Sequence, residues 1–241
     1  MGQLVFRTLT AALPLLVVLL LPFLRADRAA LPDPGALIEA RELTAYLLAD
    51  GGFVRQLGPE TAGYTANFDA DGFGSFGWQF THTTGAPLTG LRLVVFLDAD
   101  IDRSLNTFFN EYGTLVALSL PPGAPAGSLA PSAWEIDEPG FLFGDITQHL
   151  VTGSLDNTNG VPSGAPEDVS LALGFQFGTL APGASLTASF LISQTEVGGL
   201  SQTDPDSDHR FHFNGYLRRA NAAPVIVPAR AFAKSVLQPK A

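Results

Sequence analysis

Ser185-Leu-Thr-Ala-Ser-Phe-Leu-Ile-Ser-Gln194 alternates between apolar and polar side chains almost throughout. One face of the segment holds Leu186, Ala188, Phe190 and Ile192, and the other holds Ser185, Thr187, Ser189 and Ser193, with Leu191 as the exception. Successive side chains of a β-strand point to opposite faces, so a period of two indicates a strand with one buried face. The stretch therefore predicts an antiparallel strand packed against a core.

Short segments of this kind recur along the chain, separated by 25 glycines and 18 prolines. We expect strands at Tyr64–Phe68, Gly74–Thr81, Leu91–Leu97, Thr114–Leu120, Ala133–Ile136, Ile146–Gly153, Val169–Phe177, Ser185–Gln194 and Arg210–Leu217. Strands of this length between turn residues are typical of a β-sandwich. The sequence predicts an all-β fold with one antiparallel β-sandwich, immunoglobulin-like or jelly-roll-like, over residues 36–219.

Two segments need separate treatment. Leu91–Leu97 is apolar on both faces, which predicts a central strand that is covered on both sides. Gly35–Ala49 fits either a helix or a strand. We favour a strand, because Asp50-Gly51-Gly52 follows it and is typical of a hairpin turn.

The N-terminus predicts export from the cytoplasm. Arg7 precedes the apolar run Leu9–Leu24, and small residues follow it, as in a secretory signal peptide. We expect a signal segment over residues 1–29, with an uncleaved membrane anchor as the alternative. The expected location is secreted or in the cell envelope, and residues 220–241 are expected to form a loosely ordered tail.

Composition narrows the classes of partner. The chain has no cysteine, so neither disulfides nor thiolate metal sites can stabilise the fold. The apolar core must therefore stabilise it alone. The net charge of −10 argues against nucleic acid and against anionic membrane surfaces. We expect an extracellular protein or a polysaccharide as the partner, and contact with a membrane only through an uncleaved signal segment.

The second half of the chain carries a family resemblance. Val169–Phe190 is a strand, a Gly-Thr-Leu-Ala-Pro-Gly turn and a strand, and the polar stretch Gly199–Ser207 follows it. Together with Phe96–Gly113, these segments resemble exported bacterial β-sandwich proteins that usually carry a PEP-CTERM sorting tail. The resemblance implies a surface or matrix role. The chain departs from these proteins at Val225–Arg230, which lacks the Pro-Glu-Pro motif and the following apolar helix, so we expect plain secretion.

The loop after Leu91–Leu97 is the candidate metal site. Asp98, Asp100 and Asp102 stand at alternate positions, and the further oxygen donors are Ser104, Asn106 and Glu111. Oxygen ligands of this kind suit a structural Ca²⁺ ion. The loop is not an EF-hand, because Arg103 replaces the glycine of position six and Phe109 replaces the glutamate of position twelve. A solvated strand end and a catalytic group remain the alternatives.

Other motifs test an enzymatic interpretation. Trp134-Glu-Ile-Asp-Glu138 is similar to the catalytic strand of laminarinase-like glycoside hydrolases, but Glu138 follows Asp137 directly and therefore points away from Glu135. We expect no enzymatic activity and no further cofactor. The alternative is a carbohydrate-active protein, lectin-like or hydrolytic, in which Trp78 or Trp134 would stack on sugars. Two further acidic clusters, Asp69–Gly72 and Asp204–His209, are expected to be turns.

Overall fold

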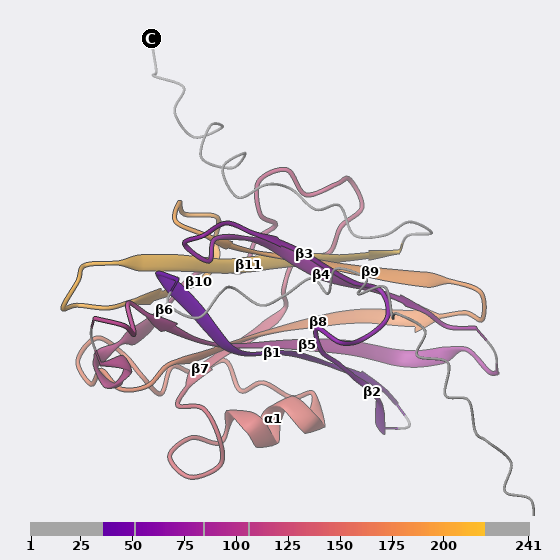
Figure 1. Cartoon of the computed structure of the whole chain (residues 1–241). Helices are drawn as coiled ribbons and strands as arrows, with labels where there is room; N and C mark the ends of the chain where they lie inside the picture. The colour runs from indigo at the N-terminus through magenta and orange to yellow at the C-terminus, as the bar shows by residue number, and fades with distance from the viewer. Residues whose placement is uncertain (1–35, 51, 84, 106, 220–241) are drawn as a thin grey trace, which may run out of the picture.

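The computed structural model describes residues 36–50, 52–83, 85–105 and 107–219, which form two antiparallel sheets stacked face to face (Figure 1). The five-stranded sheet has the order β2-β1-β5-β8-β7, and the six-stranded sheet has the order β3-β4-β9-β11-β10-β6. The strands are β1 Ile38–Ala49, β2 Gly52–Leu57, β3 Tyr64–Phe68, β4 Gly74–Thr81, β5 Leu88–Ile101, β6 Tyr112–Ala117, β7 Ala133–Asp137, β8 Ser170–Leu180, β9 Ser185–Ser193, β10 Gly199–Thr203 and β11 Arg210–Arg219.

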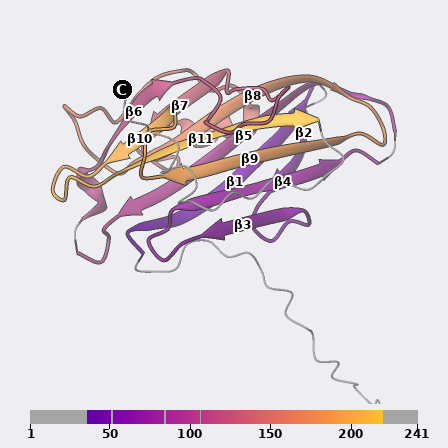
Figure 2. The ribbon, with the colours of Figure 1, turned by 90° about the horizontal axis from the view of Figure 1, so that it is seen from above.

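The expected all-β, sandwich-like architecture is confirmed at this level. Seen from above, the two sheets overlap along most of their length (Figure 2). The predicted signal segment 1–29 and the predicted tail 220–241 lie outside the described residues. Among the residues that are described, no helix is both long enough and apolar enough to span a bilayer.

The core lies between the sheets and is rich in aromatic rings. Phe76 of β4 and Phe190 of β9 stack with their ring centroids 5.3 Å apart, and Phe213 of β11 lies 6.2 Å from Phe76. Phe175 of β8 meets Phe190 edge-on at 5.8 Å from the facing sheet. All four rings are at most 1 % exposed, so the alternation seen in the sequence places one face of each strand in this core.

β5 is the central strand, as predicted, and both of its faces are covered. It runs between β1 and β8, and its core-facing residues are Leu91, Leu93, Val95, Leu97, Ala99 and Ile101. On the opposite face Val94 and Phe96 are buried beneath a short helix. The strand is longer than Leu91–Leu97, because it continues through the first two predicted metal ligands.

The strand expected at Ile146–Gly153 is wrong, because Ile146–Thr152 forms the helix α1. Ile146 and Leu150 stand four residues apart and pack together on the outer face of the five-stranded sheet. Gly153 ends the helix in a left-handed conformation, with φ at +67°, and its N–H donates to the carbonyl of Leu150. The helical spacing and the terminal glycine outweigh the weak alternation of this segment.

The other expected strands are present, with ends that differ by a few residues, and Gly35–Ala49 contains a strand, β1, that enters a hairpin with β2. The prediction missed β10 altogether. This strand has five residues and only one large apolar side chain, Leu200, so alternation gave no signal. A short 3₁₀ turn, η1 at Phe108–Asn110, precedes β6.

Candidate functional site

Three carboxylates meet at one end of the five-stranded sheet. Asp98 and Asp100 lie near the end of β5, on the face opposite the core. Asp168 stands just before the neighbouring strand β8, in which Ser170 pairs with Asp98. One oxygen from each of the three side chains lies within 4.8 Å of the other two. We call these residues the aspartate cluster. The sequence predicted two of its members and missed Asp168, which is distant along the chain.

The environment of the cluster disfavours negative charge. Burial, together with the charges of Asp168 and Asp100, raises the pKa of Asp98 to about 7. Burial likewise raises the pKa of Asp168 to about 6, with a contribution from Asp100. The three carboxylates are therefore disfavoured in their charged form, because they are partly removed from water and repel one another. A bound cation would offset this negative charge.

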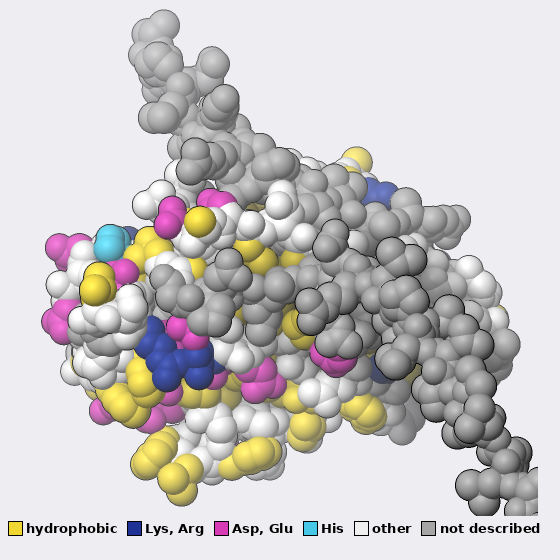
Figure 3. Space-filling model, viewed as in Figure 1, with side chains coloured by type: hydrophobic (Ala, Val, Ile, Leu, Met, Phe, Trp, Pro, Cys, Tyr) yellow, Lys and Arg dark blue, Asp and Glu magenta, His cyan; other side chains and the backbone are white. Residues whose placement is uncertain are grey.

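Two arginines neutralise part of this charge. Arg103 places Nη1 3.4 Å from Oδ2 of Asp100, and Arg41 places Nε 3.7 Å from the same oxygen. Both arginines also pair with Glu39, so their charge is shared with a fourth carboxylate. In Figure 3 the two kinds of charge lie side by side on this face of the molecule, in blue and magenta. The two arginines therefore neutralise the charge of Asp100 more than that of Asp98.

Asp102 does not join the cluster. Strand β5 ends at Ile101, and Asp102 takes a left-handed conformation with φ at +53°, which breaks the alternation that would have aligned it with Asp98 and Asp100. Its carboxylate instead forms a hydrogen bond with Nδ1 of His209. The sequence prediction grouped Asp102 with the other two because of their alternate spacing in the loop after Leu91–Leu97, and the left-handed turn removes that alignment.

Glu111 holds the two sheets together rather than facing the cluster. It is 1 % exposed, and its Oε1 accepts a hydrogen bond of 2.8 Å from the N–H of Ile101 on β5. Its Oε2 accepts from Nε2 of Gln202 on β10, which also donates to the carbonyl of Ala99. Burial raises the pKa of Glu111 to about 8. Of the two remaining predicted ligands, Ser104 lies in an exposed turn, and Asn106 is outside the described residues.

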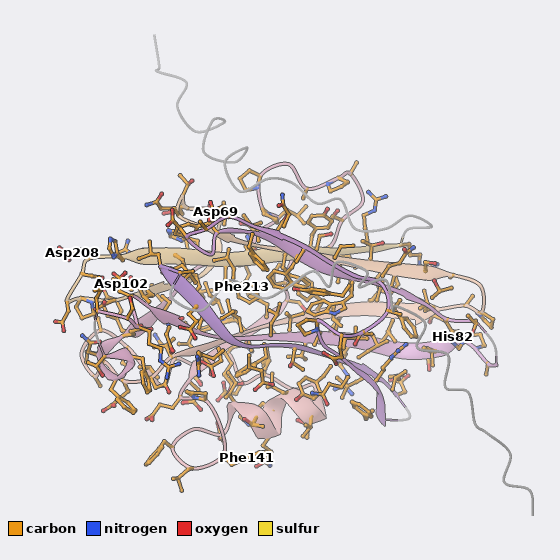
Figure 4. All side chains as sticks on the ribbon, in the orientation of Figure 1. Asp69, His82, Asp102, Phe141, Asp208 and Phe213 are labelled. Carbon is orange, nitrogen blue, oxygen red and sulfur yellow. The ribbon has the colours of Figure 1, made fainter. Side chains whose placement is uncertain are left out.

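The acidic turns gather at the same end of the sandwich. Oδ1 of Asp69 accepts hydrogen bonds from the N–H groups of Asp71 and Phe73, and Oδ1 of Asp204 accepts one from Asp206. Both segments are therefore turns closed by their own aspartates, as expected. Figure 4 shows Asp69, Asp102 and Asp208 toward one end of the molecule.

A second polar group, which the sequence did not reveal, lies beneath α1. Nδ1 of His149 lies 2.8 Å from Oε1 of Glu135, and the backbone N–H of Asp156 donates to Oε2 at 3.3 Å. Glu135 is 1 % exposed; burial raises the pKa of Glu135, and its hydrogen bond raises the pKa of His149. His149 was not linked to Glu135 because its segment was assigned to a strand.

The features expected of a sugar-binding or hydrolytic site are dispersed. Trp78 is 1 % exposed and donates Nε1–H to the carbonyl of Gly58, so it belongs to the core. Trp134 is partly buried against the same core. Glu135 and Asp137 share the outer face of β7, but Glu135 is occupied by His149, and Oδ2 of Asp137 accepts from the N–H of Asp145.

Comparison of the chain with protein-family models, with curated proteins and with solved structures finds no significant match. The interpretation of the site therefore rests on its own geometry.

Replacing Glu111 with alanine is expected to lower the free energy of unfolding by about 1–3 kcal/mol, because Ile101 and Gln202 would lose their buried acceptor. Urea denaturation at pH 7 measures the change. Glu111→Gln keeps one acceptor oxygen and should lose less, and the exposed Glu60→Ala should change little. Equal values for Glu111→Ala and Glu60→Ala would contradict the role given to Glu111.

The raised carboxyl pKa values predict a pH dependence of stability. In the folded protein Asp168, Asp98 and Glu111 keep their protons up to about pH 6, 7 and 8, whereas the ordinary values are 3.8 for aspartate and 4.5 for glutamate. The folded state therefore binds more protons than the unfolded state between about pH 4 and 8, and its stability should fall as the pH rises through this window.

Thermal melts in chelator between pH 5 and 8.5 test this dependence. His212, whose pKa is lowered by burial, acts in the opposite direction below its ordinary value of 6.5, so the fall should be clearest above pH 6.5. A melting temperature that rises from pH 6.5 to 8 would refute the assignment.

Proposed function

We propose that this protein is a non-catalytic β-sandwich, immunoglobulin-like or jelly-roll-like, that is exported from a bacterial cell. Its role is in surface, matrix or adhesive interactions, and a structural Ca²⁺ ion at the aspartate cluster stabilises it. The observation that carries the proposal is the convergence of three carboxylate oxygens within 4.8 Å at the end of β5 and the start of β8.

The chemistry of the cluster suits a hard cation. Calcium takes six to eight oxygen ligands, several of them carboxylate oxygens, and completes its shell with backbone carbonyls and water. Asp98 is only partly buried, so an ion and its water ligands can reach it. The raised pKa of Asp98 has burial and neighbouring negative charge as its main causes, and a divalent cation offsets both.

A structural role for calcium fits a chain without cysteine. No disulfide joins the two sheets, and the ends of a sandwich are the places where strands separate most readily. An ion held between β5 and the start of β8 would bind only the folded state and would stabilise it by mass action. The expected secretion and the acidic composition favour the same conclusion, since both suit an extracellular domain that works by binding.

Calcium is expected to raise the melting temperature by about 5–10 °C when its concentration is a hundredfold above Kd. Asp98→Asn should abolish this shift. In chelator the same variant should melt above the wild type at pH 8, because the substitution removes a disfavoured charge. Differential scanning calorimetry with calcium and with chelator measures both effects.

The matched control is Asp206→Asn, which changes an exposed aspartate outside the cluster and should leave both melting temperatures unchanged. An unshifted wild-type melting curve at millimolar calcium would remove the metal from the proposal. A calcium shift that survives in Asp98→Asn would place the ion elsewhere.

The carbohydrate-binding alternative has one feature in its favour. A hollow of about 250 Å³ lies between the β1–β2 hairpin and the start of β5, and its lining includes Asp50, Phe53 and Pro87. Phe53 is 58 % exposed, and an exposed ring beside a carboxylate is suited to a sugar. The remaining carboxylates and both tryptophans lie away from the hollow's lining, so we rank this function second.

If the hollow binds sugars, a glycan array should give signals that Phe53→Ala reduces at least tenfold, since the substitution removes the stacking ring. Phe109→Ala, which changes an equally exposed phenylalanine outside the hollow, serves as the control. A blank array for the wild type would leave only the structural role.

A further inference from the structure

The loop between β7 and α1 exposes three consecutive large apolar side chains. Phe141, Leu142 and Phe143 are 78 %, 81 % and 74 % exposed, whereas the other exposed large apolar side chains of the described residues, such as Leu105 and Phe109, stand singly along the chain. Single exposed apolar residues are common on soluble proteins, but a contiguous group indicates an interaction site. Figure 4 shows Phe141 at the outer margin of the molecule, beyond α1.

The base of this loop is held by hydrogen bonds. Oδ2 of Asp137 accepts from the N–H of Asp145 at 2.8 Å, so the two ends of the loop are joined. Oγ1 of Thr147 donates to the carbonyl of Gly140 at 2.9 Å, which fixes the loop against the first turn of α1. The apolar tip is therefore presented on an ordered base.

Other exposed apolar side chains lie on the same side of the molecule. Val151 of α1 is 46 % exposed and Phe53 of β2 is 58 % exposed. Figure 1 places the loop and α1 below the five-stranded sheet, with the edge strand β2 of that sheet on the same side, and Figure 3 shows apolar side chains spaced along that margin. We call Val151, Phe53 and the three residues of the loop tip the apolar margin.

Shape and charge both indicate what covers this margin. A flat protein surface would cover only one side of a protruding tip. The interfacial zone of a bilayer surrounds an inserted tip, and it accepts phenylalanine and leucine side chains. Acidic groups stand at the base of the loop, among them Glu138 and Asp145, and they would be repelled by anionic lipids. The matching surface is therefore a bilayer of zwitterionic lipids.

The length of the chain ahead of the sandwich is compatible with this contact. Residues 25–35 separate the apolar run Leu9–Leu24 from the first described residue. A segment of that length reaches at most about 40 Å when fully extended. If the run stays in the membrane as an anchor, this segment keeps the sandwich close to the bilayer. The loop tip can then reach the bilayer surface.

We propose that Phe141, Leu142 and Phe143 insert into the interfacial zone of a zwitterionic bilayer, so that the apolar margin rests on the membrane. The three tip residues are not members of the aspartate cluster, and the proposed contact involves no metal ligand. It adds a membrane-facing side to the domain, distinct from any anchoring by the N-terminal segment.

A fluorescent label at the loop tip tests the proposal directly. Because the chain has no cysteine, Leu142→Cys provides a single attachment point for a nitrobenzoxadiazole probe in the full chain. On addition of phosphatidylcholine vesicles we expect a blue shift and increased emission, which spin-labelled lipids should quench. Leu105→Cys, at a site 86 % exposed on the loop after β5, carries the control label and should show neither effect.

A second pair of variants tests the neighbouring side chains. In the Leu142-labelled protein, replacing both Phe141 and Phe143 with serine should abolish the blue shift, while Phe109→Ser should preserve it. An unresponsive label at position 142 would overturn the proposal, as would equal responses at positions 142 and 105. A shift that appears on concentrating the protein without vesicles would assign the margin to a second copy of the chain. A response to anionic vesicles alone would contradict the charge argument.

Discussion

The contact between Phe175 of one sheet and Phe190 of the other is the interaction on which the rest of the structure depends. No disulfide joins the two layers, so the aromatic and aliphatic side chains between them must supply the attraction. Phe76 and Phe213 extend the same stack across the six-stranded sheet. Rings packed at these separations are specific in geometry as well as apolar, which fixes how the sheets face each other.

This core leaves the outer faces free to carry polar chemistry. On the five-stranded sheet, β5 buries one set of residues and turns the alternate set outward, where Val94 and Phe96 lie beneath α1 and Asp98 and Asp100 lie beyond it. One strand thus changes from an apolar surface to an acidic one within a few residues. The buried carboxylate of Glu111 adds a polar connection between the sheets, which favours one alignment of β5 with β10.

The sequence predicted the sandwich well because alternation is local. Ser185–Gln194 shows a clear period of two and is a strand almost to its predicted end. Ile146–Gly153 was misassigned because Ile146 and Leu150 satisfy helical spacing, which a short segment does not separate from alternation. Leu200 alone could not reveal β10.

The candidate site was predicted only in part, because its members come from distant segments. Asp98 and Asp100 share a strand and could be paired from their spacing, whereas Asp168 joins them only through the pairing of β5 with β8. Asp102 does not belong to the cluster, because a left-handed turn places it beside His209, more than a hundred residues along the chain. No periodicity in the sequence encodes either contact.

The pairing of β4 with β9 has a consequence for how the molecule forms. Thr81 and Ser185 bring their hydroxyl oxygens within 2.9 Å across 104 residues of chain, so the middle of the six-stranded sheet cannot close until the last third of the polypeptide has been made. Proteins dominated by such distant pairings fold slowly, because the entropy cost of closing a long loop comes before the stabilising contacts form. The two sheets therefore become a closed sandwich only when most of the chain is available, and the edge of β4 has no partner from β9 until then.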